Sequence, residues 1–296
     1  GTNLNFPDID HLWNVPTGYV DFSKVRIDGL QWGNDNGFSI SSGEFASASG
    51  EISIDGANNG GTFNLGVGSK AGDTIALGQR VRLIGGDAAD EYAMLGFFTD
   101  AAGDPATGNI WVGAKAGGVL VQSGSGARSS AQIGHGGNGG NTNLKNLSGS
   151  ISVRADGGGA IGNISVLSGT GDTGQAQIGH GGRQNDGSHS GDIVVIGEAI
   201  AVTSAASVAQ IGHGGFQGTG AYSGNLFINH DPLANGGLGA AVGGGGALSI
   251  TAGSGFDDYA QIGHGGVVAT TGNRTGNIIV GRSASVTLQG GTNKST

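Results

Sequence analysis

The chain contains no cysteine, which excludes a disulfide framework and thiolate metal sites. Proline is scarce, with 4 residues among 296, and the 13 lysines and arginines form no basic run. The formal net charge of −9 therefore argues against nucleic acid or an anionic membrane as a partner. No stretch approaches the roughly 18 apolar residues of a membrane-spanning helix, so we expect no membrane insertion. The first residues lack a secretory signal, which fits a cytosolic protein or a mature or excised portion of a longer one.

Glycine is abundant, with 66 residues. It follows no Gly-X-Y period, which excludes collagen, and apolar triplets recur between the glycines and can bury a core, which argues against disorder. We expect glycine to supply corners with positive φ and to permit close approach between backbone segments.

One seven-residue motif, Ala-Gln-Ile-Gly-His-Gly-Gly, occurs four times. Its copies occupy residues 131–137, 176–182, 209–215 and 260–266. The histidines of successive copies are 45, 33 and 51 residues apart (135 to 180, 180 to 213, 213 to 264), so the repeat has no fixed period. The motif predicts a repeated turn of structure whose connecting loops vary in length.

Two other apolar segments accompany each motif in a constant order. One has the form Gly-polar-apolar-x-apolar, as at residues 149–153, and the other is an apolar-x-apolar pair such as Ile164 and Val166. Alternation bounded by glycine, asparagine and serine is typical of strands. Three short strands in cyclic order predict an all-β parallel β-helix, or solenoid, in which equivalent strands of successive turns pair about 4.8 Å apart.

The pattern predicts this β-helix over residues 46–296, with irregular turns of about 33–58 residues. Residues 50–98 are interpreted as a degenerate first turn, with residues 50–54 as the Gly-polar-apolar segment and Val81 and Leu83 as the apolar pair. Residues 93–98 then align with the motif. Full turns begin near residues 50, 108, 149, 191 and 224, and a sixth begins near residue 276 without a third strand. We expect an open end, cut from a longer rod or completed by another subunit.

Residues 1–45 differ from the rest because they hold two of the three tryptophans, Trp13 and Trp32. We expect an aromatic-rich N-terminal cap or assembly segment, with a carbohydrate-binding platform as the alternative. Residues 24–27 resemble residues 80–83, so the helix can begin as early as residue 24.

The motif histidines would stack at the strand spacing and could share a metal. No carboxylate or cysteine recurs with them, and the degenerate turn has phenylalanine at their position. We therefore predict a structural ladder of aromatic packing, with no metal or other cofactor, whose imidazoles stay neutral because of burial and mutual repulsion. The members of this ladder are His135, His180, His213, His264 and Phe97.

The motif glutamines would form a second ladder on the opposite face of the strand, with amides bonded along the column. Its members are Gln132, Gln177, Gln210 and Gln261.

Catalytic carboxylates are not brought together by the predicted register. Asp87, Asp90 and Glu91 lie four turns, or about 19 Å, from Asp257 and Asp258, whereas glycosidase carboxylates lie within roughly 5–9.5 Å. We predict no catalytic residue and no enzyme activity. A polysaccharide-binding or polysaccharide-degrading β-helix protein stays open as the alternative.

The motif copies, alternating with Gly-Asn-Ile-x-Val segments and glycine-rich corners, resemble repeats of large secreted bacterial exoproteins of the filamentous-haemagglutinin class. The resemblance implies a right-handed β-helix, an extracellular or cell-surface location, and a role in adhesion or surface structure. We accordingly expect a structural or adhesive solenoid, a protomer or fragment of an extracellular filament, that presents variable loops such as residues 229–247. Expected partners are further copies joined head to tail, the continuation of a longer chain, or a surface glycan or host or cell receptor.

Overall fold

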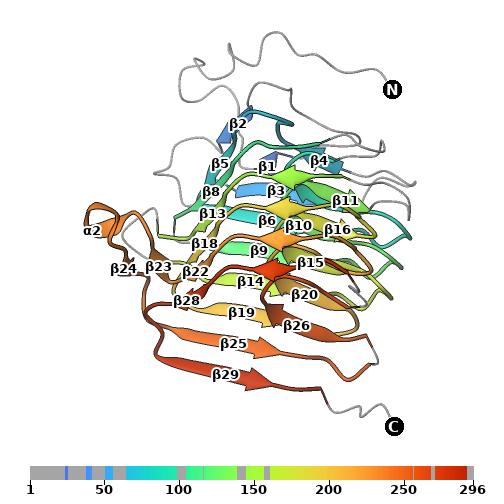
Figure 1. The fold of residues 1–296 in the computed structure, drawn as a ribbon. Helices are drawn as coiled ribbons and strands as arrows, with labels where there is room; N and C mark the ends of the chain where they lie inside the picture. Colours follow the sequence, from blue (N-terminus) through green and yellow to red (C-terminus); the bar gives the residue numbers. More distant parts are fainter. Residues whose placement is uncertain are drawn as a thin grey trace.

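The computed structural model describes residues 24–25, 38–41, 51–55, 65–98, 105–115, 117–138, 145–156, 161–255, 257–267 and 271–291. These residues form strands joined by turns, and their three large sheets contain parallel pairs throughout (Figure 1). The prediction of an all-β chain with parallel sheets is confirmed. In the described ranges no helix is long and apolar enough to cross a membrane.

The largest sheet, called here the eight-stranded sheet, contains the apolar-x-apolar pairs. Its strands, in spatial order, are β1 (Lys24–Val25), β3 (Glu51–Asp55), β6 (Arg80–Ile84), β9 (Val119–Gln122), β14 (Ile164–Leu167), β19 (Ile200–Thr203), β25 (Ala247–Thr251) and β29 (Ser285–Gln289).

A seven-stranded sheet contains the Gly-polar-apolar segments. Its strands are β2 (Phe38–Ser41), β5 (Thr74–Gly78), β8 (Ile110–Ala114), β13 (Ile151–Arg154), β18 (Ile193–Ile196), β22 (Leu226–Ile228) and β28 (Ile278–Val280).

A six-stranded sheet contains the motif. Its strands are β4 (Leu65–Val67), β7 (Ala93–Leu95), β10 (Ala131–Ile133), β15 (Gln175–Ile178), β20 (Val208–Ile211) and β26 (Tyr259–Ile262). All four motif copies are neighbours in it and pair alanine to alanine, glutamine to glutamine and isoleucine to isoleucine.

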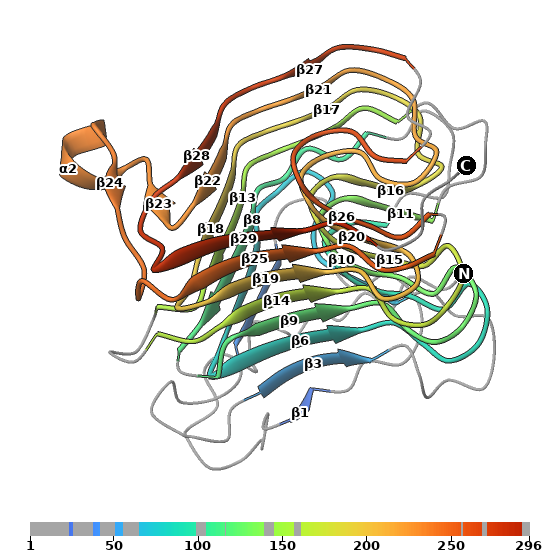
Figure 2. The same ribbon diagram turned by 90° about the horizontal axis from the view of Figure 1, so that it is seen from below.

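The chain visits the three sheets in a repeating order. It passes through β13, β14 and β15 and then through β18, β19 and β20, each strand lying beside its predecessor of the same sheet. Viewed from below, the strands of each sheet follow one another in sequence order (Figure 2). This arrangement is consistent with a β-helix.

The core lies between the three sheets and is built of apolar columns. Ile151 and Val153 are fully buried, and the intervening Ser152 is not, because successive side chains of a strand point to opposite faces. Each such isoleucine or valine contributes about 1.5–3 kcal/mol through burial. The alanines and isoleucines of the first three motif copies belong to the same core, and Ala260 and Ile262 of the last copy pack against it.

The degenerate first turn differs from its prediction in one strand. Residues 51–55 were assigned to the Gly-polar-apolar segments, which is wrong: Ile52 pairs with Val81 in the eight-stranded sheet. β5 takes the predicted place, with Thr74 opposite Ile110. Both segment types show the same apolar alternation, so the pattern could not separate them. The alignment of residues 93–95 with the motif is confirmed, because Ala93 pairs with Ala131.

Two strands are described inside the predicted cap. Lys24 pairs with Glu51, and Phe38 pairs with Thr74, so both β1 and β2 extend large sheets. The similarity of residues 24–27 to residues 80–83 is thus matched by a shared sheet. Trp13 and Trp32 lie outside the described residues, and the cap stays a prediction.

Smaller sheets complete the turns. Two strands begin at the last two glycines of motif copies, β11 (Gly136–Asn138) and β16 (Gly181–Arg183). Four short strands precede the seven-stranded sheet, namely β12 (Leu147–Ser148), β17 (His189–Ser190), β21 (Tyr222–Ser223) and β27 (Arg274–Thr275).

The predicted variable loop forms a projecting hairpin, called here the insertion hairpin. It contains β23 (His230–Asp231), the short α2 (Ala234–Gly237) and β24 (Ala240–Ala241), and β23 pairs antiparallel with β24. It stands away from the stacked strands beside β22 and β28 (Figure 1).

Candidate functional site

The four motif histidines lie in one column, called here the histidine column. Neighbouring imidazole rings have centroids 4.9 Å apart and planes within 5° of parallel. The parallel in-register pairing of the motif produces this stack directly, since equivalent residues of adjacent strands lie one strand spacing apart.

Both ring nitrogens of each histidine are used. The backbone N–H of His135 donates to Nδ1 of His180 at 3.0 Å, and the same bond links His180 to His213 and His213 to His264. Each Nε2 lies 2.7–2.8 Å from a glycine carbonyl oxygen that precedes the seven-stranded sheet. These carbonyls belong to Gly108, Gly149, Gly191 and Gly224.

These bonds fix the protonation state. A backbone N–H can only donate, so Nδ1 must be unprotonated, and a carbonyl can only accept, so Nε2 carries the proton. The rings are neutral, and the lone pair that a metal would need is already engaged. The described residues contain no group of three or more histidine, aspartate or glutamate side chains that could hold a metal ion.

Burial lowers the pKa of these imidazoles. It brings the pKa of His135 to about 4 and that of His213 to about 3, despite the bonds from Nε2 to carbonyl oxygens. The pKa of His180 falls well below the usual value, through burial first and then through its two histidine neighbours. Burial also lowers the pKa of His264.

Phe97 occupies the position equivalent to His135 in the preceding turn, as its register requires. Comparison with it shows what the histidine Nδ1 does. Its backbone N–H donates to Nδ1 of His135 at 3.0 Å. One turn earlier the equivalent N–H belongs to Ser69, and a phenylalanine ring cannot accept it. The hydroxyl of Thr74 accepts it instead at 2.8 Å. The histidines therefore act as hydrogen-bond acceptors for the backbone, and aromatic packing alone does not describe the column.

The motif glutamines also form a column, but their amides do not bond to one another as predicted. In the first three copies Nε2 reaches a glycine carbonyl of the next turn: Gln132 reaches Gly179 at 2.8 Å, and Gln177 reaches Gly212 at 2.9 Å. Gln210 bonds Gly263 in the same way at 2.9 Å. The backbone approaches closely at these glycines, since a methyl group built on Gly134, Gly179 or Gly212 would meet a glycine oxygen of the next turn at 1.9 Å.

The predicted acidic groups hold loops. Asp90 accepts a hydrogen bond from Arg128 Nε at 2.6 Å, and Asp87 accepts one from the Ser125 hydroxyl at 2.7 Å. Glu91 is buried and caps the Ala88 N–H at 2.9 Å. On the other loop, Asp258 accepts the N–H of Gly255. The structure does not bring the acidic residues at 87–91 together with those at 257–258.

A second column joins Leu147, His189, Tyr222 and Arg274, which occupy equivalent places in β12, β17, β21 and β27. The His189 and Tyr222 rings stack at 4.9 Å, and the Arg274 guanidinium lies 4.2 Å from the Tyr222 ring centroid. Burial lowers the pKa of His189 to about 3. The sequence predictions do not include this column. The sequence signal that could have predicted it is a Ser-Gly or Thr-Gly pair directly after each member.

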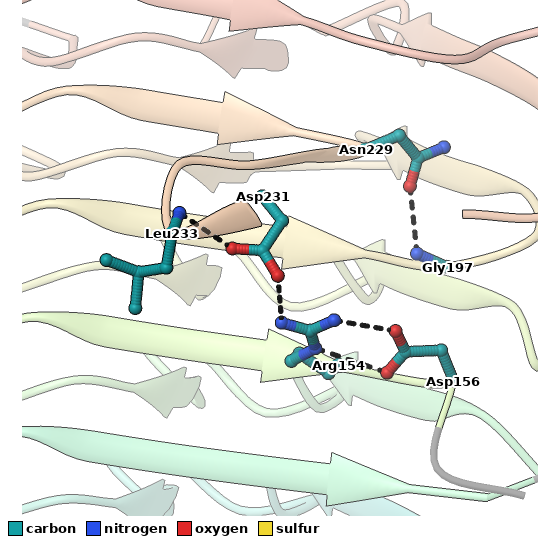
Figure 3. A network of polar contacts seen from close by, with 6 residues as sticks. All are labelled: Arg154, Asp156, Gly197, Asn229, Asp231 and Leu233. Atoms are coloured by element: carbon teal, nitrogen blue, oxygen red, sulfur yellow. Dashed lines mark hydrogen bonds and ion pairs between the residues drawn. The ribbon is translucent and has the colours of Figure 1, made fainter. Parts of the chain in front are cut away.

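The insertion hairpin is fastened at its base (Figure 3). Arg154 contacts Asp156 and Asp231, each at 2.9 Å, and Asp231 also accepts the N–H of Leu233 at 2.9 Å. The buried Asn229 accepts the Gly197 N–H through its side chain at 2.9 Å. No sequence signal marks these anchors, because Arg154 and Asp231 are 77 residues apart.

The hairpin presents apolar side chains to solvent. Leu233 is 76% exposed and Leu238 is 89% exposed. Residues 232–247 carry no charged side chain. Isolated exposed leucines are ordinary, but two on one projecting and anchored hairpin, within a stretch that has no charged side chain, form a distinctive contact surface.

Comparison of the chain with protein-family models, with curated proteins and with solved structures finds no match.

Proposed function

We propose that this chain is a parallel β-helix, with three strands per turn and turns of irregular length, that serves as a secreted or cell-surface structural or adhesive element. The resemblance of its motif to repeats of filamentous-haemagglutinin-like exoproteins supports the extracellular placement and a right-handed helix.

One observation carries the structural part of the proposal: the polar groups of the motif are engaged between turns. The imidazole nitrogens bond backbone N–H and carbonyl groups, and the glutamine amides bond glycine carbonyls of the next turn. A residue set used in this way in three successive copies builds a rod and has little left with which to bind a substrate.

The adhesive part depends on the insertion hairpin. Its anchors lie at the base, and Leu233 and Leu238, which flank α2, are exposed. Apolar side chains held on a rigid support lose little conformational freedom on binding, which favours recognition. We propose that this hairpin contacts the receptor or surface glycan.

The test is an adhesion assay with the chain coupled to beads and presented to cells and to a panel of immobilised glycans. The double variant Leu233→Ser/Leu238→Ser should bind at least about tenfold less, a loss equivalent to about 1.4 kcal/mol. Its unfolding transition should match that of the unsubstituted chain, since both leucines are exposed.

Trp111→Ser is the matched control, because Trp111 is another exposed apolar side chain, 42% accessible, on the seven-stranded sheet. Equal losses in both variants would mean nonspecific stickiness. Release of reducing sugar ends from any glycan would refute the structural assignment in favour of a polysaccharide-degrading enzyme.

A further inference from the structure

The final strands of the three large sheets leave inward-facing apolar side chains uncovered. β26, β28 and β29 are the last members of their sheets. Four side chains of β28 and β29 are 42–74% exposed, although Leu226, Ile228 and Leu248, which pair with three of them, are at most 2% exposed. The exposed side chains are Ile278, Val280, Val286 and Leu288.

The last motif copy lacks the partners that every earlier copy has. Among the described residues the His264 N–H has no hydrogen-bond acceptor, whereas the three preceding motif histidines each donate to an imidazole. Gln261 Nε2 reaches only the carbonyl of His264 at 3.3 Å, whereas its counterparts bond a glycine carbonyl of the next turn at 2.8–2.9 Å.

The space beside Gly263 is also open. A methyl group built on Gly179 or Gly212 would meet a glycine oxygen of the next turn at 1.9 Å, but on Gly263 it would approach only the chain's own Gln261. The missing contacts therefore have a defined chemistry: an imidazole acceptor, a glycine carbonyl and two apolar strands.

We propose that this end of the sheets binds a strand carrying another copy of the motif, paired parallel to β26. The incoming histidine accepts the His264 N–H through Nδ1, the incoming glycine carbonyl accepts from Gln261, and the strands that follow cover Leu288 and its neighbours. This inference rests on the structural function proposed above and names its partner as a further turn of the same repeat.

The opposite end of this chain is a poorer match. Its first described strand in the six-stranded sheet is β4, and the residue equivalent to the motif histidine there is Ser69. The serine hydroxyl is shorter than an imidazole and already accepts the Gly72 N–H at 3.1 Å. Head-to-tail joining of two copies would leave the His264 N–H with no ring to receive it.

The experiment titrates the full chain into a fluorescent synthetic peptide of residues 176–207, one turn from a motif copy to the residues just before the next, and follows anisotropy. We expect saturable binding. A His180→Ala peptide should bind at least about tenfold more weakly, because the His264 N–H is then buried without an acceptor.

The protein side has a matched pair of variants. Leu288→Lys places a charge in the uncovered apolar face and should abolish binding, whereas Thr287→Lys, one residue earlier and pointing to the other face, should leave it unchanged. Both sites are exposed in the free chain, so both variants should fold.

Three results would overturn the proposal: no binding by either peptide, equal binding of both, or equal effects of the two lysines. Concentration-dependent self-association in sedimentation that Leu288→Lys abolishes would also overturn it, by showing that the opposite end of a second copy is the partner. The bead adhesion assay and the peptide titration, both run on the unsubstituted chain, separate the two proposals. Retained adhesion with failed peptide binding refutes this inference alone, and failed adhesion with retained peptide binding refutes the adhesive function alone.

Discussion

At the scale of single residues, the motif histidine is a substitute for backbone pairing at a corner where the strand has ended. The extended backbone gives each His N–H no carbonyl of the next turn, and the imidazole supplies a nitrogen in its place. Thr74 does the same for Ser69 where phenylalanine interrupts the column. Buried N–H groups must be paired, and the histidine is one of few side chains that can also satisfy a carbonyl on its other side.

His180→Ala tests this role. The substitution leaves the buried His135 N–H and the partly buried Gly149 carbonyl without partners, and the loss should lower the free energy of unfolding by about 1–4 kcal/mol. Urea denaturation followed by circular dichroism measures the change. His264→Ala, at the half-buried end of the column, should cost less than half as much. Equal costs at both positions would contradict the hydrogen-bond role.

At the scale of elements, the distance between strands near the motif depends on its glycines. Gly181 has φ of +118°, and a methyl group there would lie 2.2 Å from the Gly214 oxygen. Neither the backbone angle nor the contact tolerates a side chain.

Gly181→Ala should therefore destabilise the chain by more than about 2 kcal/mol, as buried overpacking and strain commonly do. Thermal unfolding gives the comparison with Gly290→Ala, where no atom lies within 4 Å of the added methyl. If both variants melted with the unsubstituted chain, the close approach between turns would be wrong.

The insertion hairpin is a separate element whose attachment can be loosened without opening the core. Arg154→Ala removes its contacts to Asp156 and Asp231, which are partly exposed, so global stability should fall by about 1 kcal/mol or less. Limited proteolysis should then cut within residues 232–247 several times faster. Arg128→Ala, which breaks the remote pair with Asp90, should leave that cleavage rate unchanged. Unaltered cleavage in Arg154→Ala would show that Asn229 alone fixes the hairpin.

At the scale of the whole molecule, the buried imidazoles make stability depend on pH. Their folded pKa values, about 4 for His135 and about 3 for His189 and His213, lie below the roughly 6.5 of an unfolded chain. The unfolded state therefore binds more protons below pH 6.5. The stabilisation is complete above that pH and is lost as pH falls towards 4, by about 1.4 kcal/mol per pH unit for each such histidine.

Urea titrations at pH 7.5, 6.0 and 5.0 measure this dependence. The midpoint should change little above pH 7 and then drop steeply. The His180→Ala variant should show a shallower slope than the unsubstituted chain, because one proton fewer is taken up on unfolding. A midpoint that rises or stays level from pH 7 to pH 5 would refute the neutral, buried column.

The sequence predicts those features that repeat and misses those that occur once. Identical motif copies specify their own register, so the pairing of Ala131 with Ala176 follows from the pattern. Residues 51–55 fit two sheets equally well by alternation, and only their pairing with β6 decides. The Arg154 to Asp231 contact joins distant turns without any repeated signal. The sequence did not predict that the motif glutamine amides bond glycine carbonyls and not one another, because the positions of those carbonyls depend on the three-dimensional path of the backbone at the glycine corner.

The paired base of the insertion hairpin has a practical consequence. Because His230 lies opposite Ala241, the two strands that enter and leave the insertion hairpin already lie side by side. An unrelated peptide grafted between them should therefore leave the pairing of the large sheets undisturbed. The insertion hairpin is therefore a suitable place to graft a vaccine epitope or an engineered binding loop.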